Sequence, residues 1–227
     1  MKFYKALDSV KLKKYSEVDK NQFALTFYSK SGFKSSELFD KELKKKVSKF
    51  FADEKRSSLF LSKELTGLKG DFLVLRDFNK NKSEYKKYAW MKGLFANLDK
   101  YAVENAVIYA DTSHLSKDDN FLFDLAKTAE KASYRYTDTN PNTKKELILK
   151  NVSLAVESAS AAQKRVVELG YNVGSGANTA RNLGDRPANH ATPAYIANAV
   201  KGLAKDIGGF SVEILEEKDM KKLGMGC

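Results

Sequence analysis

The sequence predicts an α/β fold in which helices flank a mixed sheet. Up to about residue 155, short apolar runs rich in β-branched and aromatic residues alternate with segments whose apolar residues recur every three or four positions. Such alternation implies crossover connections, and therefore a largely parallel or mixed sheet with helices on its faces. From residue 158 to residue 183 the helical period continues without a break, which predicts one long helix after this domain.

The first part of the chain supplies the predicted sheet and its helices. Leu43, Val47 and Phe50 follow Phe39 at helical steps, and Met91, Phe95 and Leu98 follow Tyr88 in the same way. Strands are predicted at 23–28, 106–110 and 146–154, with two further short apolar runs at 58–61 and 72–75. Helices are predicted at 36–51, from just after Ser83, and at 117–131.

The second part begins with the long helix and continues in shorter elements. Glycine in a helix interior costs up to about 1 kcal/mol relative to alanine, so Gly170, Gly174 and Gly176 need a packing reason such as the close approach of another backbone. Pro187 ends this helix, and Thr192 and Pro193 start another as N-cap and first helical residue. That helix is expected to reach about Asp206 and to end at Gly208, followed by a strand at 211–215 and a short helix at 217–223.

Composition excludes several classes of protein. With 227 residues, 42% of them hydrophobic, the chain can build one folded domain and an additional part. No uncharged apolar run approaches the roughly 18–20 residues that cross a bilayer, and the start lacks the apolar core of a secretory signal. We therefore expect a cytoplasmic protein without a membrane partner.

The residues that could carry chemistry do not form a recognisable active site. His114 and His190 lie far apart, and the single cysteine, Cys227, can neither form an internal disulfide nor complete a zinc cluster. Carboxylates at Asp118, Asp119 and Asp124 lack the spacing of a calcium-binding loop and are expected to cap the following helix. The residues alone therefore predict no catalytic, cofactor-binding or metal-binding position.

The net charge of +11 lies entirely in the first 100 residues. A basic surface of this kind could bind nucleic acid, with Lys44, Lys45 and Lys49 on helix 36–51 as the candidate contacts. The same lysines also fit an ordinary solvated helix face, and arginine, which reads bases best, is rare in this part of the chain. A DNA-binding or architectural module is kept as the alternative function.

A motif in the second part resembles a known family. From Ala180 the chain reads Ala-Arg-Asn-Leu-Gly-Asp-Arg-Pro-Ala-Asn-His-Ala-Thr-Pro, which resembles the pattern Ala-Arg-Asp-Leu, a short gap, Pro, one residue, Asn, two residues and Thr-Pro of the leucyl aminopeptidases, the cytosol aminopeptidase family. Residues 212–226 resemble that family's next strand, helix and Leu-Gly-Met-Gly turn, and Tyr134-Arg-Tyr is a weaker third match. The residues on the first motif are Arg181, Leu183, Pro187, Asn189, Thr192 and Pro193.

The resemblance implies a domain organisation and a function. It implies a macro-domain-like N-terminal domain over 1–155, a linker helix over 156–186, and the start of a truncated catalytic domain over 187–227. The full-length protein would release N-terminal residues such as leucine from peptides with two divalent metal ions, manganese or zinc, and would form a hexamer. The family's metal ligands and catalytic residues all follow the Leu-Gly-Met-Gly turn, so the resemblance implies that this chain alone is inactive.

Overall fold

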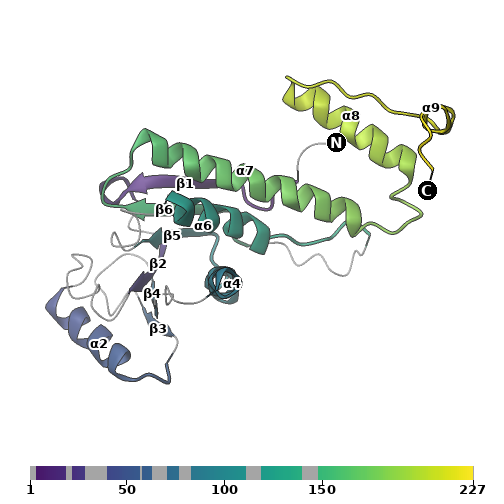
Figure 1. Ribbon diagram of the computed structural model, residues 1–227. Helices are drawn as coiled ribbons and strands as arrows, with labels where there is room; N and C mark the ends of the chain where they lie inside the picture. The colour runs from purple at the N-terminus through teal and green to yellow at the C-terminus, as the bar shows by residue number, and fades with distance from the viewer. Residues whose placement is uncertain are drawn as a thin grey trace.

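The structure is a computed structural model, and it describes residues 4–18, 22–28, 40–56, 58–62, 71–76, 83–110, 119–139 and 148–226. Within these residues the chain forms a six-stranded sheet with the strand order β1-β6-β5-β2-β4-β3 (Figure 1). β3 runs antiparallel to β4, whereas all other neighbouring strands are parallel. The predicted α/β fold with a mixed sheet and flanking helices is confirmed.

The strands agree with the sequence pattern except at one edge of the sheet. The strands are β1 Ser9–Lys14, β2 Phe23–Tyr28, β3 Ser58–Leu61, β4 Phe72–Arg76, β5 Asn105–Tyr109 and β6 Asn151–Val156. The strand predicted at 146–154 begins later, at Asn151, and Leu147 lies outside the described residues. β1 was not predicted: Val10 and Leu12 are buried, whereas the lysines of the strand are exposed or half-buried, and among the described strands it pairs only with β6.

The helices also follow the predicted periods. They are α2 Lys41–Ala52, α4 Glu84–Lys100, α6 Asp119–Ala132, α7 Ala161–Gly184, α8 Pro193–Ile207 and α9 Glu217–Lys222, with a short 3-10 turn, η1, at Tyr15–Glu17. Asp40 caps α2 by accepting a hydrogen bond from the Leu43 N–H at 2.8 Å. Phe39 of the predicted helix 36–51 lies outside the described residues.

Alternate residues of the strands face two separate cores. Leu73 and Leu75 of β4 point to the core under α4, α6 and α7, whereas Val74 between them points to the core under α2. α2 buries Val47 and Phe50 in that second core, on the face of the sheet opposite the other three helices (Figure 1). Because the two faces are covered by different helices, the sheet is buried on both sides, as a largely parallel sheet requires.

Helices α6 and α7 pack closely at two glycines. A Cβ atom added at Gly170 would lie 2.4 Å from the Phe123 carbonyl oxygen, and one added at Gly174 would lie 2.9 Å from the Lys127 carbonyl oxygen. Both positions therefore need glycine because the α6 backbone leaves no room for a side chain. The same expectation is wrong for Gly176, where a Cβ would meet nothing within 4 Å.

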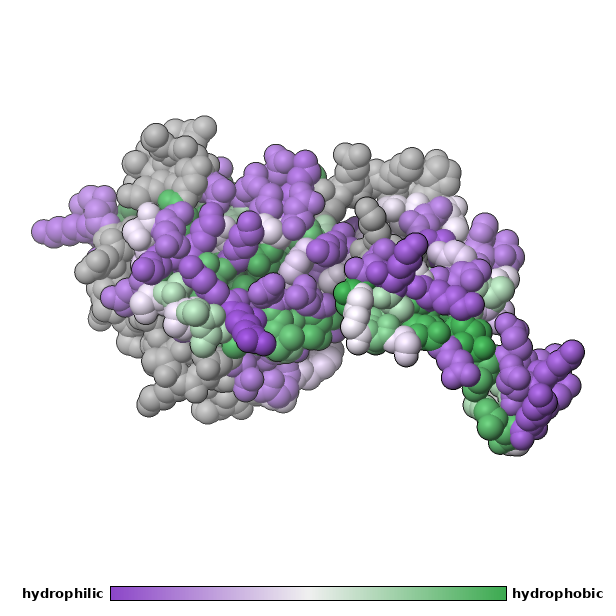
Figure 2. All heavy atoms as spheres, turned by 90° about the horizontal axis from the view of Figure 1, so that it is seen from above, coloured by the Kyte–Doolittle hydropathy of each residue, from purple (hydrophilic) through white to green (hydrophobic). Residues whose placement is uncertain are grey.

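The last part of the chain projects from the end of α7. Thr192 caps α8 by accepting a hydrogen bond from the Tyr195 N–H at 3.2 Å, and Gly208 follows its last residue with a φ of 71°. The strand predicted at 211–215 is wrong, because this segment has no strand partner among the described residues. Figures 1 and 2 show that α8 and α9 extend away from the sheet, with apolar side chains along this extension. The exposed large apolar residues of this part of the chain are Ile196, Ile207, Phe210, Leu215, Leu223 and Met225.

A search of the described helices for a span both long and apolar enough to cross a bilayer finds none.

Candidate functional site

Arg181, the first arginine of the sequence motif, links the end of α7 to the end of α6. Arg181 Nη1 donates a hydrogen bond to the Lys131 carbonyl oxygen at 3.0 Å, and the guanidinium lies 4.2 Å from the centroid of the Tyr134 ring. The carbonyl belongs to the last turn of α6, where unpaired carbonyl oxygens attract positive charge. Arg181 therefore links the two helices and holds Tyr134 against α7.

Tyr134 is the second link between these elements. Its hydroxyl donates a hydrogen bond to Asp185 Oδ2 at 2.7 Å, and its side chain is buried. Burial, reinforced by the hydrogen bond and the charge of Asp185, raises the pKa of Tyr134 well above its usual range. The phenol is therefore neutral at physiological pH and acts as a hydrogen-bond donor rather than as a base.

A third link ties the end of α7 to the start of α8. Arg186 pairs with Asp138, and its guanidinium lies 5.1 Å from the centroid of the Tyr195 ring on α8. Asn182 Nδ2 also approaches Asp138 Oδ2, at 3.4 Å. These contacts join the segment after α6 to both helices of the motif region.

The remaining motif residues shape the turn between α7 and α8. The Pro187 carbonyl accepts hydrogen bonds from the N–H groups of His190 at 2.8 Å and Ala191 at 2.9 Å. Asn189 is exposed, and Leu183 is half-buried on α7. Thr192 and Pro193 begin α8 in the predicted way. In the described contacts these residues set the path of the chain and do not form a catalytic group.

A buried carboxylate, Glu130, anchors the N-terminal segment on α6. Its oxygens accept hydrogen bonds from the N–H of Ala6 at 2.6 Å, the N–H of Leu7 at 2.9 Å and Nδ2 of Asn178 at 3.2 Å. Burial raises the pKa of Glu130, although these donors oppose the shift. Sequence reasoning missed this residue, but a glutamate beside Ala126 and Ala129 on the core face of a predicted helix was the available signal.

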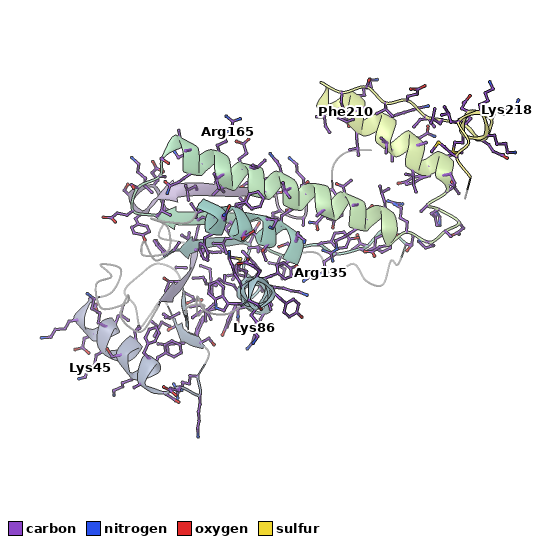
Figure 3. All side chains as sticks on the ribbon, viewed as in Figure 1. Lys45, Lys86, Arg135, Arg165, Phe210 and Lys218 are labelled. Atoms are coloured by element: carbon purple, nitrogen blue, oxygen red, sulfur yellow. The ribbon has the colours of Figure 1, made fainter. Side chains whose placement is uncertain are left out.

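The candidate DNA-contacting lysines lie far from this region. Lys45 and Lys49 are exposed on α2, and Lys44 is half-buried. Figure 3 shows Lys45 pointing away from the sheet, and α2 covers the sheet face opposite α7. The structure therefore does not bring the two sets of candidate residues together.

The sequence predicts no metal-binding position, and the structure describes some of the side chains that this prediction concerns. Asp124 does not cap the start of its helix; instead it pairs with Lys87 at 3.0 Å and Lys127 at 2.7 Å. His190 is exposed, while His114, Asp118 and Cys227 lie outside the described residues. No group of three His, Cys, Asp or Glu side chains in the described ranges could hold a metal ion, so these residues do not fit a two-metal centre.

Comparison with known proteins identifies relatives of this chain. The family profile described as "Cytosol aminopeptidase family, catalytic domain" matches residues 178–227. A probable cytosol aminopeptidase of Nitrosococcus oceani is 35% identical over 106 residues, which are 45% of this chain and 21% of that protein. One from Saccharophagus degradans is 32% identical over 147 residues, which are 59% of this chain and 28% of that protein.

The fold is shared with a solved aminopeptidase over almost the whole chain. A tomato leucine aminopeptidase variant superposes with a TM-score of 0.73 over 96% of this chain and 46% of its own, at 18% sequence identity. The matched part therefore spans less than half of that enzyme, and 21% and 28% of the two curated relatives.

Proposed function

We propose that this chain belongs to the cytosol aminopeptidase family and forms the N-terminal part of a leucyl aminopeptidase that releases residues such as leucine from the N-terminus of peptides. The observation that carries the proposal is the motif from Arg181 to Pro193, which lies inside the segment matched by the family's catalytic domain. Names of the curated relatives support a cytoplasmic location.

The proposal divides the chain into three parts. Residues 1–155 form the N-terminal α/β domain, 156–186 the linker helix, and 187–227 the start of the catalytic domain. The first two parts would serve assembly of a hexamer and access of peptides to the active site. The exposed apolar residues of α8 and of the segments on either side of α9 support the third assignment, because further catalytic-domain residues would cover them.

Catalysis in the whole enzyme would depend on two divalent ions, manganese or zinc, which would activate a water molecule and polarise the peptide carbonyl. The described residues do not fit such a site, so no step of the reaction is assigned to them. We therefore expect the 227-residue chain alone to lack peptidase activity.

A chimaera tests this proposal directly. The present chain would replace the corresponding N-terminal part of the Nitrosococcus oceani protein, and hydrolysis of a leucine chromogenic amide would be measured with manganese or zinc. We expect activity from the chimaera that a chelator abolishes, and none from the 227-residue chain. A chimaera that elutes as a folded protein but is inactive, or hydrolysis by the chain alone, would contradict the proposal.

The exposed lysine side of α2 favours DNA binding as a second candidate. Replacing Lys44, Lys45 and Lys49 by glutamine should then weaken duplex binding equally for all sequences and reduce the salt dependence of the affinity. Fluorescence anisotropy with two unrelated duplexes at several salt concentrations measures both effects. Unchanged affinity in the triple variant would remove α2 from this function.

A further inference from the structure

An open pocket lined by positive charge lies where α4, α6 and α7 meet. Its volume is about 300 Å³. The lining side chains come from α4, from the end of α6 and the residues after it, and from α7; Arg135, labelled in Figure 3, lies between these elements. The lining residues are Tyr88, Lys92, Lys131, Ala132, Tyr134, Arg135 and Arg181, which we call the cationic pocket.

Among the described residues, the lining of the cationic pocket contains four basic side chains and no acidic one. Three carboxylates on or next to these helices have other partners. Glu130 holds the N-terminal segment, Asp124 pairs with Lys87 and Lys127, and Asp185 accepts the Tyr134 hydroxyl. Positive charge is therefore concentrated at this surface, which favours a ligand that carries several negative charges.

Two guanidinium groups of the pocket are held in position by backbone carbonyls. Arg135 Nη1 donates to the carbonyl oxygens of Ala132 at 3.1 Å and Tyr134 at 2.9 Å. Arg181 Nη1 donates to the Lys131 carbonyl oxygen, and the Arg181 guanidinium lies over the Tyr134 ring. The contacts of Arg181 hold its guanidinium in one orientation beside the pocket, which reduces the conformational entropy that binding of an oxyanion would cost.

Capping of the α6 C-terminus explains only part of this arrangement. Arg135 and Arg181 both reach carbonyl oxygens of the last turn or the residues just after it, as cations at a helix end do. Lys92 comes from the middle of α4 and is exposed, so it does not serve that helix end. Lys92 therefore adds a positive charge to the pocket that capping of α6 does not require.

We propose that the cationic pocket binds a small phosphate ligand that carries two or more negative charges, with inorganic phosphate and pyrophosphate as its simplest forms. Guanidinium groups pair with phosphate oxygens through two parallel hydrogen bonds, and lysine adds a point charge. A single carboxylate carries one charge against the four cations of the lining, whereas pyrophosphate carries several, so the charges are better matched by phosphate.

The test is a titration of the 227-residue chain at constant ionic strength, measured by isothermal calorimetry with phosphate, pyrophosphate and citrate. We expect saturable binding at one site, tightest for pyrophosphate. The Lys92→Gln, Arg181→Gln double variant should weaken pyrophosphate binding about tenfold or more, since it removes two charge-assisted contacts. The single variant Lys92→Gln, which changes an exposed side chain, should weaken binding at least severalfold without disturbing the fold.

A matched control distinguishes binding at the cationic pocket from a general effect of the positive charge of the chain. Lys45→Gln, Lys49→Gln removes two positive charges from α2 and should leave the affinity within twofold of the original. Non-saturable binding, or equal losses in the α2 and pocket variants, would overturn the proposal. Citrate binding as tightly as pyrophosphate would overturn the assignment to phosphate.

Discussion

The contact between α6 and α7 at Gly170 predicts a large loss of stability from a single added methyl group. In Gly170→Ala the new Cβ would lie 2.4 Å from the Phe123 carbonyl oxygen, and a backbone atom cannot move aside without shifting the helix. Overpacking of this kind costs about 1–3 kcal/mol or more, whereas alanine in a helix interior gains up to about 1 kcal/mol over glycine. Because the obstructing atom belongs to the backbone, we expect a net loss of about 1–2 kcal/mol in the free energy of unfolding.

Gly176 supplies a control in the same helix. A Cβ at this position meets nothing within 4 Å, so Gly176→Ala should stabilise the protein by about 0.5–1 kcal/mol through helix propensity alone. Urea denaturation followed by circular dichroism measures both variants against the original chain. If Gly170→Ala were as stable as Gly176→Ala, the inferred close packing of α6 and α7 would be wrong.

Three further predictions concern ionised groups and the extent of the folding unit. Burial would raise the pKa of Asp124, but hydrogen bonds from its two lysines, including Lys87 on α4, lower it below its ordinary value; Asp124→Asn should therefore cost about 1–2 kcal/mol at pH 7 and less at pH 3, because the unfolded carboxyl is protonated at that pH and the advantage of the folded carboxylate begins to be lost. Glu130→Gln should cost about 1–3 kcal/mol, because the amide nitrogen cannot accept a hydrogen bond, whereas both oxygens of a carboxyl group can; because the pKa of Glu130 is raised, ionisation disfavours the folded state and the cost should shrink as the pH rises from 4 to 7. Denaturant titrations at each pH measure the cost of both substitutions in the free energy of unfolding. A cost of Asp124→Asn that is the same at pH 3 as at pH 7 would contradict the first prediction, and a cost of Glu130→Gln that grows with pH would contradict the second. A chain ending at residue 186 should unfold cooperatively in calorimetry, whereas one ending at residue 158 should not; two equally cooperative transitions would show that α7 is dispensable.

Elements whose burial follows from their own sequence could be predicted from it. The spacing of Leu43, Val47 and Phe50 is sufficient to define α2, and all three are buried. Likewise, Thr192 and Pro193 locate the start of α8 because an N-cap acts within its own first turn.

Features that depend on a distant part of the chain could not be predicted in this way. β1 is short and rich in lysine, and it exists because β6 offers hydrogen bonds and the core receives Val10 and Leu12. Residues 211–215 have a strand-like composition but no neighbouring strand in the described structure, so no ladder forms. Gly170 and Gly176 look alike in sequence, and only the position of α6 distinguishes them. The cationic pocket was missed for the same reason, since its side chains come from three separate helices.

The contacts of α7 show why it is more than a connection between two parts of the chain. The Tyr171 hydroxyl donates to the Leu7 carbonyl oxygen at 2.7 Å, and Thr179 Oγ1 accepts from the Tyr4 N–H at 3.0 Å. These bonds hold the segment that leads into β1, which itself forms the edge of the sheet. The catalytic-domain match begins at residue 178, inside the same helix. α7 therefore holds the N-terminal segment that leads into the sheet, and its last two turns also lie within the segment that the catalytic-domain profile matches.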